Sequence, residues 1–179
     1  MIFKPGSLQG LVLIEPRVFE DPRGFFLESY RKDLFAANGI DCDFVQDNHS
    51  RSKYGTVRGL HYQSAPGQAK LIRCTHGAIW DIAVDIRPKS PTFGRWTGVE
   101  LTASNRLMLF IPIGFAHGFA VLSEDAEVQY RCSAYYNAAT EAGFRWNDPR
   151  IGVEWRVSDP ILSARDQNSP SFGEIFPGN

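Results

Sequence analysis

The sequence predicts an all-β protein, mainly β with a few short helices, in which two sheets pack as a sandwich or barrel. Apolar and polar residues alternate with period two along several segments, which is typical of strands with one buried face. The 16 glycines and 11 prolines divide the chain at short intervals, as in a fold with many turns. With 179 residues, 43% of them hydrophobic, the chain suits a single domain, residues 1–179, with its own core.

The segment Ala78–Arg87 shows the alternation most clearly, because its even-numbered apolar residues alternate with positions that include Asp81 and Asp85. A short helix is expected at Lys32–Ala37, where Gly39 can supply the left-handed residue that ends it. The tail from Asn147 is expected to be irregular. Strands are expected, in chain order, at Leu11–Glu15, Gly24–Tyr30, Phe44–Gln46, Thr56–Gln63, Lys70–His76, Ala78–Arg87, Val99–Leu101, Leu107–Ile111, Phe119–Leu122 and Glu127–Tyr136.

Three of these strands carry polar residues on faces that a sandwich turns inward. Alternation in the last strand points Tyr130 and Tyr136 inward together. Lys70 shares a face with apolar residues, so its ammonium either lies along an apolar or ligand-filled surface or reaches water at the strand end. Strict alternation places Arg58 and His61 on opposite faces, whereas a bulge at the intervening glycine would aim both inward.

The composition limits the classes of partner that this protein is expected to bind. Nineteen Lys and Arg against twenty Asp and Glu give a net charge of −1, which argues against a nucleic-acid partner. Fourteen of the cations are Arg, a side chain suited to gripping a small phosphate or carboxylate ligand. The start of the chain has no signal-like apolar run, and no apolar stretch is long enough for a bilayer, so no membrane partner is expected. Three cysteines without CxxC spacing favour reduced thiols and a cytoplasmic location.

The run Pro112-Ile113-Gly114-Phe115-Ala116-His117 has the Pro-x-Gly-x-x-His form of the second cupin motif, which turns its histidine into the barrel. Metal-binding cupins also need a His-x-His pair, and here His61 is followed by Tyr62 and Gln63. With four histidines in the chain and no such spacing, we expect no metal site and a cupin-like jelly roll that works without one. His49 and His76 are expected to be structural.

Six segments spread along the chain form a distinctive set: Asp21-Pro22-Arg23-Gly24-Phe25-Phe26, Phe44-Val45-Gln46-Asp47-Asn48-His49-Ser50, Arg58-Gly59-Leu60-His61, Ser90-Pro91-Thr92-Phe93-Gly94, Gly114-Phe115-Ala116-His117-Gly118-Phe119 and Leu162-Ser163-Ala164-Arg165-Asp166. Together they closely resemble the dTDP-4-dehydrorhamnose 3,5-epimerase family. The resemblance runs in order from about Leu11 to Pro170 and implies an isomerase with a cupin-like jelly roll.

The resemblance implies epimerisation of dTDP-4-keto-6-deoxyglucose at C3 and C5, through enolates, on the way to dTDP-L-rhamnose, with no cofactor. His61 matches the family's catalytic base and Asp166 its carboxylate partner. Lys70 matches the cation that meets the enolate oxygen, and Tyr130 matches the acid that returns a proton on the opposite face. Spacing alone would leave Asp166 an ordinary tail residue, because 105 positions separate it from His61.

The resemblance also implies a set of substrate-binding residues. Arg23 comes from the neighbouring subunit in this family, so a homodimer is implied. Tyr136 fits core packing as well as ligand contact, and Arg165 stands where the family often has Lys, which keeps the charge but changes the geometry. The loop Gln63–Ala69 is one residue shorter than in relatives. The implied set is Arg23, Glu28, Gln46, Asn48, Arg58, His117, Tyr136, Glu141 and Arg165.

Two alternatives stay open. A mono-epimerase, acting at C3 or C5 alone in another deoxysugar pathway, would share His61 and Asp166, although Tyr130 argues against it. A non-catalytic nucleotide-sugar-binding cupin would need neither Lys70 nor Tyr130.

Overall fold

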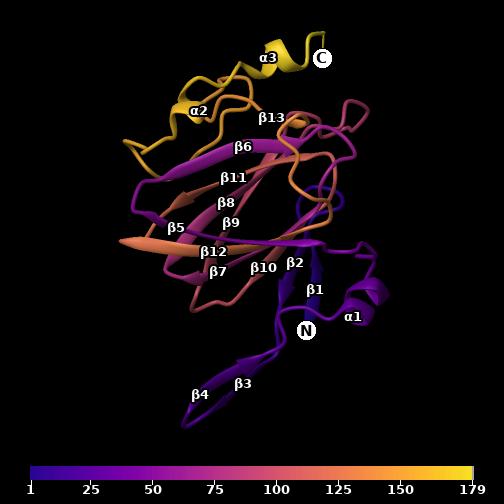
Figure 1. Cartoon of the computed structure of the whole chain (residues 1–179), viewed down its shortest axis with the longest axis vertical. Helices are drawn as coiled ribbons and strands as arrows, with labels where there is room; N and C mark the ends of the chain where they lie inside the picture. Colours follow the sequence, from indigo (N-terminus) through magenta and orange to yellow (C-terminus); the bar gives the residue numbers. More distant parts are fainter. Residues whose placement is uncertain (179) are drawn as a thin grey trace.

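The computed structural model describes residues 1–178, and its strands form two packed antiparallel sheets with the order of a jelly roll (Figure 1). The first sheet has the order β1-β2-β10-β7-β12-β5, and the second has the order β13-β6-β11-β8-β9. The strands of the first sheet are β1 (Ile2–Pro5), β2 (Val12–Glu15), β10 (Met108–Ile111), β7 (Lys70–His76), β12 (Asp125–Cys132) and β5 (Gln46–Lys53). Those of the second are β13 (Glu141–Gly143), β6 (Val57–Gln63), β11 (Phe115–Val121), β8 (Ala78–Asp85) and β9 (Trp96–Thr102).

The predicted cupin-like, mainly β fold is confirmed, and most predicted strands are present within a few residues. The helix α1 (Lys32–Ala37) has the predicted bounds, and Gly39 after it has the expected positive φ of 83°. Two of these predictions were wrong in detail. The predicted strand Phe44–Gln46 ends where β5 begins. β5 continues to Lys53 through a polar stretch, and this stretch pairs with β12. Strand β12 ends at Cys132 and not at Tyr136.

The N-terminal strand β1, the hairpin strand β3 (Val18–Asp21) and the three-residue β13 were missed, because none shows a long alternating pattern. β3 pairs with β4 (Gly24–Leu27), which is shorter than the predicted Gly24–Tyr30. The tail is largely irregular as predicted, except for two one-turn helices, α2 (Ala164–Gln167) and α3 (Phe172–Ile175). Each begins at a serine whose side chain accepts a backbone N–H, a cap too short to produce a visible periodic pattern.

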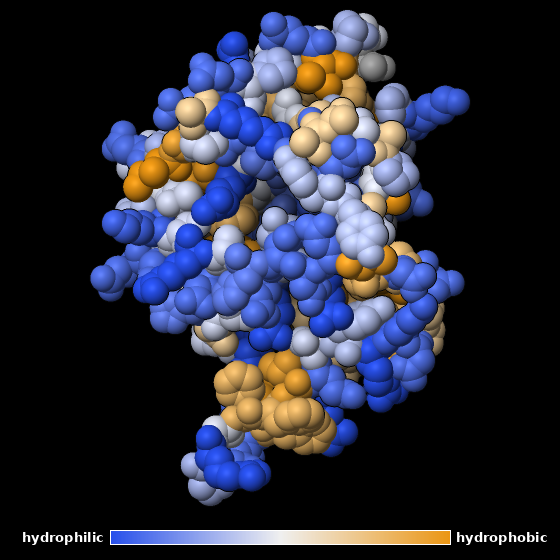
Figure 2. Space-filling model, viewed as in Figure 1, coloured by the Kyte–Doolittle hydropathy of each residue, from blue (hydrophilic) through white to orange (hydrophobic). Residues whose placement is uncertain are grey.

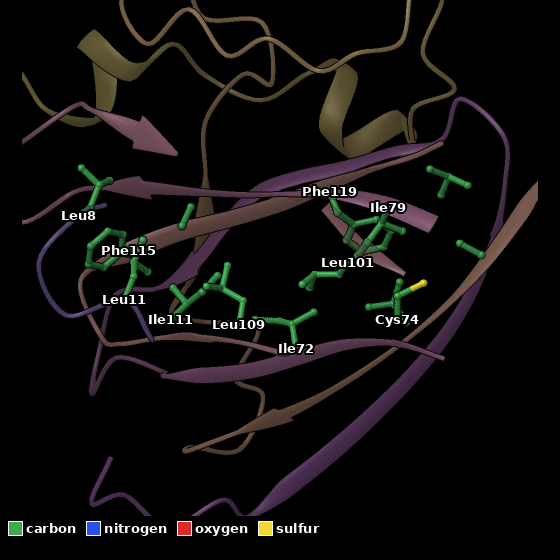
Figure 3. Packing of buried hydrophobic residues seen from close by; sticks show 14 residues of the cluster. Leu8, Leu11, Ile72, Cys74, Ile79, Leu101, Leu109, Ile111, Phe115 and Phe119 are labelled. Carbon is green, nitrogen blue, oxygen red and sulfur yellow. The ribbon is translucent and has the colours of Figure 1, made fainter. Parts of the chain in front are cut away.

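The main core lies between the sheets, where side chains from both inner faces interdigitate (Figure 3). On the inner face of β11, Phe115 and Phe119 contribute to this core, and Ile72 and Leu109 face them from the other sheet. The outer face of the second sheet is covered by the C-terminal segment, which supplies Phe172 and other aromatic residues to a second cluster. Figure 1 shows α2 and α3 lying over β6 on this side.

Strand β6 contains the bulge at Gly59 that would aim Arg58 and His61 inward together. His61 pairs with His117 of β11, while Arg58 pairs with Phe119, so two residues of β6 face one residue of β11. Gly59 has a φ of 130°, and a Cβ built on it would lie 2.6 Å from the Cα of Gly118. The position therefore requires glycine, both for its backbone angle and for the close approach of the two strands.

The hairpin of β3 and β4 projects from the body of the protein as a separate two-stranded sheet (Figure 1). Apolar surface gathers where this hairpin joins the body, as Figure 2 shows in orange. On the hairpin itself, Phe19, Phe25 and Phe26 are 47%, 57% and 67% exposed. Arg106 contacts the hairpin through an ion pair with Glu20 at 3.0 Å and lies over the ring of Phe25, yet much of the surface of the three phenylalanines stays exposed.

Candidate active site

A cavity of about 450 Å³ opens between the two sheets. β5, β7 and β12 of the first sheet form one wall, β6, β11 and β13 form the other, and the segment that enters α2 closes one side. Most of its lining residues carry polar groups, unlike those of the core further along the same interior. Its side chains are Gln46, Asn48, Ser50, Thr56, Val57, Arg58, His61, Tyr62, Gln63, Gln68, Lys70, His117, Phe119, Tyr130, Tyr136, Glu141, Ile161, Leu162, Ser163, Arg165 and Asp166.

His61 and Asp166, 105 residues apart, meet at one side of this cavity. Nε2 of His61 lies 2.5 Å from Oδ1 of Asp166, whose side chain is only 3% exposed. The bulge in β6 delivers the histidine, and α2 delivers the carboxylate. The hydroxyl of Ser163 accepts the backbone N–H of Asp166 at 3.1 Å, which fixes the first turn of the helix.

The electrostatics of this pair favour an ionised carboxylate. Burial by itself raises the pKa of Asp166. The hydrogen bond and the charge of His61 lower this pKa by more than burial raises it, so the net pKa lies below its ordinary value. An ionised carboxylate only accepts hydrogen bonds, so the bonded ring nitrogen of His61 carries the proton. The other ring nitrogen is then unprotonated while the ring is neutral, and it can accept a proton from a molecule in the cavity.

Lys70 and Tyr130 come from the opposite sheet, on β7 and β12. Burial lowers the pKa of Lys70, and the nearby Cys132, Asp81 and Glu141 raise it in part. Burial raises the pKa of Tyr130, and the positive charge of Arg58 lowers it in part. Both side chains line the cavity, as the alternation of their strands predicts for an inward face.

A hydrogen-bonded group surrounds the cavity mouth. One carboxylate oxygen of Glu141 accepts from the hydroxyl of Tyr136 at 2.9 Å and from Arg165 at 2.6 Å. Burial raises the pKa of Glu141, but the bonds from Arg165 and Tyr136 outweigh it and the net pKa is lowered. Gln46 donates to Asn48 at 3.0 Å and accepts the backbone N–H of Tyr136 at 2.8 Å. Tyr136 is 57% exposed in a loop and does not continue the inward face of β12.

Eleven of the thirteen residues singled out from the sequence line this one cavity, and two do not. Arg23 sits in the turn of the projecting hairpin, where it forms an ion pair with Asp21 and its side chain is 90% exposed. Glu28 follows β4 and lies 3.8 Å from Arg31. Neither lines the cavity of its own chain.

Sequence reasoning did not single out several lining residues. Ser50 and Phe119 continue the alternation of Asn48 and His117, so the period of their strands was the available signal. Gln68, from the loop before β7, donates to the backbone carbonyl of Ala134 at 2.8 Å, a contact that no local pattern could indicate.

The four histidines each meet one carboxylate, in the pairs His49–Glu127, His61–Asp166, His76–Asp125 and His117–Asp81. Across residues 1–178, no three His, Cys, Asp or Glu side chains are grouped closely enough to hold a metal ion. No helix within the same residues is both long and apolar enough to cross a membrane.

The jelly roll and the cavity with its His61–Asp166 pair define a cupin-like protein with a site suited to proton transfer, and relatives specify which kind. A dTDP-4-dehydrorhamnose 3,5-epimerase from Shigella flexneri is 51% identical over 168 residues, which cover 93% of each chain. The crystal structure of a dTDP-6-deoxy-D-glucose-3,5-epimerase from Legionella pneumophila, in complex with dTDP-4-keto-L-rhamnose, is 41% identical with a TM-score of 0.94. The match covers 97% of this chain and 94% of the Legionella pneumophila chain.

The match to the family itself spans residues 5–174, nearly the whole sequence. This chain therefore belongs to the dTDP-4-dehydrorhamnose 3,5-epimerase family. A dTDP-4-dehydrorhamnose 3-epimerase from Streptomyces niveus is also related, at 40% identity over 176 residues that cover 97% of this chain and 85% of that protein.

Proposed function

We propose that this enzyme epimerises dTDP-4-keto-6-deoxyglucose at C3 and C5, giving dTDP-4-dehydro-L-rhamnose in the biosynthesis of dTDP-L-rhamnose. Family membership supports this reaction. The observation that carries it is the placement of two proton-transfer groups on opposite walls of one cavity. His61, backed by Asp166, belongs to the second sheet, and Tyr130 belongs to the first. Inversion needs this arrangement, because the proton leaves one face of the carbon and returns to the other.

In the proposed mechanism, the unprotonated ring nitrogen of His61 removes the proton on the carbon beside the ketone, and the C–H electron pair moves into an enolate. Asp166 stabilises the imidazolium that forms and keeps the ring in place. Lys70 donates a hydrogen bond to the enolate oxygen, where a preorganised cation contributes about 3–4 kcal/mol. Tyr130 then gives its proton to the opposite face of the carbon. The step is redox-neutral, and one proton is lost and one gained.

The same four residues act at both carbons in this proposal, because C3 and C5 flank one ketone. The substrate turns or changes ring shape between the two events, while Lys70 keeps its contact with the shared oxygen. His61 and Tyr130 return to their starting protonation states by exchange with solvent. Solvent hydrogen therefore enters each inverted carbon, and this entry makes the reaction measurable.

The remaining lining residues would hold the nucleotide. Arg58 and Arg165 suit the diphosphate, because guanidinium donors match phosphate oxygens two at a time. Gln46 and Asn48 project from the same face of β5 and offer amide groups to the base or sugar. Tyr136, Glu141 and His117 complete the set.

We further propose that the chain, a single domain, works as a cytoplasmic homodimer. The hairpin projects with its three phenylalanines exposed, and it holds Arg23 away from the cavity of its own chain. Docking on a second copy would cover this apolar surface and bring Arg23 and Glu28 to the partner's site. The described cysteines, Cys42, Cys74 and Cys132, form no disulfide, in keeping with a reducing compartment.

The test is to incubate the purified protein with dTDP-4-keto-6-deoxyglucose in heavy water and follow deuterium at C3 and C5 by NMR. Deuterium at both carbons, with the inverted product, is the expected result. Label at one carbon only would make the enzyme a mono-epimerase, as in the 40% identical 3-epimerase. Absence of deuterium at both carbons would indicate a non-catalytic protein that only binds the nucleotide sugar. His61→Ala is expected to abolish exchange at both carbons while still binding dTDP, and wild-type turnover by this variant would refute the mechanism.

A further inference from the structure

One buried carboxylate beside the cavity has no part in the proposed mechanism. Asp81 lies on the inner face of β8, and none of its surface is exposed. Its Oδ2 lies 2.9 Å from Nε2 of His117. Its Oδ1 is enclosed and has no hydrogen-bond partner among residues 1–178.

Asp85 provides the contrast, because it lies on the same face of β8, four residues after Asp81. It is equally buried, but its carboxylate accepts from Arg87 at 2.7 Å and from the hydroxyls of Ser90 and Thr92. These bonds hold the loop after β8. Burial raises the pKa of Asp85, but the hydrogen bonds outweigh burial, so the net pKa is strongly lowered. Asp81 has neither an arginine nor a hydroxyl beside it. A buried carboxylate with a single hydrogen bond is unfavourable unless positive charge lies near.

That positive charge is available on Lys70 of β7, in the opposite sheet, which interacts with Asp81 through space. No carboxylate of residues 1–178 forms an ion pair with its ammonium within 4 Å. Of the two carboxylates that act on Lys70 through space, Asp81 and Glu141, the second is already bonded to Arg165 and Tyr136. The remaining group that acts on the charge of Lys70 is the thiol of Cys132 on β12, and Tyr130 and His117 line the same cavity. Asp81 is thus the negative charge left to balance Lys70 inside the fold.

We propose that Asp81 is a positioning residue of this active site, whose carboxylate fixes the tautomer of His117 and balances the charge of Lys70. The inference rests on the proposed function, in which Lys70 stabilises the enolate. An ionised Asp81 accepts, so Nε2 of His117 carries the proton and Nδ1 remains an acceptor. The ring of His117 lines the cavity and can there receive a hydrogen bond from a sugar hydroxyl. Asp81 itself touches no substrate.

Nitrogen NMR of ¹⁵N-labelled enzyme tests the first half of the proposal without any turnover. The signals of His117 are assigned by their loss in His117→Gln. The expected result is one fixed neutral tautomer with the proton on Nε2. A proton on Nδ1, or rapid averaging between the two tautomers, overturns the proposal. This measurement uses the unaltered protein, so it decides the matter even if substitutions at position 81 prevent folding.

Kinetics of Asp81→Asn test whether the carboxylate supports turnover through His117 and Lys70, because the amide keeps the shape of the side chain and removes its charge. We expect kcat to fall about 10–100-fold, the range for carboxylates that orient a working imidazole in metal sites. KM is expected to rise as well, because the ring of His117 that receives the sugar hydroxyl no longer has a fixed tautomer. The matched control is Asp85→Asn, on the same strand and face and equally buried, which is expected to lower the melting temperature and leave kcat unchanged.

A folded Asp81→Asn enzyme with wild-type kcat overturns the proposal, and so does an equal loss of kcat in the Asp85→Asn control. Failure of the proposed function gives a different result. In that case the wild-type protein incorporates no deuterium, whatever the tautomer of His117.

Discussion

Replacement of Gly59 by Ala tests whether the bulge in β6 builds the active site. A Cβ at this position meets the Cα of Gly118 at 2.6 Å and the carbonyl oxygen of His117 at 3.0 Å, and these atoms belong to the backbone of β11. Backbone atoms cannot rotate away, so the strands must separate. An ordinary carbon contact is about 3.5–4.0 Å, which puts the required displacement at roughly 1 Å.

The cost has two parts. Holding a non-glycine residue at a φ of 130° costs about 1–3 kcal/mol, and forcing a methyl group into a packed site costs about 1–3 kcal/mol more. Gly24 separates the two parts, because its φ is 128° and a Cβ there meets nothing within 4 Å. Gly24→Ala should therefore show the first cost alone. For a chain of this length, each kcal/mol lowers the melting temperature by about 2–4 °C.

The assay combines thermal unfolding of both variants with deuterium exchange by Gly59→Ala at a temperature where it is folded. A displacement of about 1 Å at His61 is expected to reduce kcat roughly 100-fold, because proton transfer depends steeply on position. Equal melting temperatures for the two variants, together with wild-type exchange by Gly59→Ala, would refute the assignment of the bulge as the element that aims His61.

Three further substitutions test the site. Tyr130→Phe removes the proposed acid but leaves His61, so deuterium should still enter recovered substrate while little inverted product forms; inversion at the wild-type rate contradicts this role. Lys70→Gln should lower kcat by about 10²–10³-fold, measured in the same assay, if the ammonium stabilises the enolate. Asp166→Asn should cost stability, because the folded pKa of Asp166 is lowered. That stability is present in full above about pH 4 and is lost as the pH falls further, so melting of the two proteins should converge in acid.

The fold was largely predictable because two-period alternation survives wherever one face of a strand meets the core. β8 shows the limit of this signal. Its faces meet different clusters, with Ile79 in the core between the sheets and Trp80 in the cluster beneath the C-terminal segment, so almost every residue is buried. β5 failed for the opposite reason. Its residues from Gln46 to Lys53 are polar on both faces, because one face lines the cavity and the other meets solvent.

The site was predictable only in part from local pattern. Alternation and the proline–glycine motif place Lys70, Tyr130 and His117 on inward faces, as the structure shows. No pattern in the sequence could show that α2 would return to β6, since its four residues carry no periodic signal. The resemblance to the family supplied Asp166 as a candidate, and the structure places its carboxylate against His61.

The return of α2 depends on the segment that covers the outer face of the second sheet. Phe172 is 2% exposed there and packs against the rings of Phe93 and Phe144, while its backbone N–H donates to Asp148 at 2.7 Å. Because Asp166 lies six residues before Phe172, burial of this aromatic cluster limits where the carboxylate can go. A chain segment that reads as an irregular tail thus holds the second sheet together on one side and supplies the partner of His61 on the other. Its aromatic residues stabilise the fold and the site at the same time, so the two cannot vary independently.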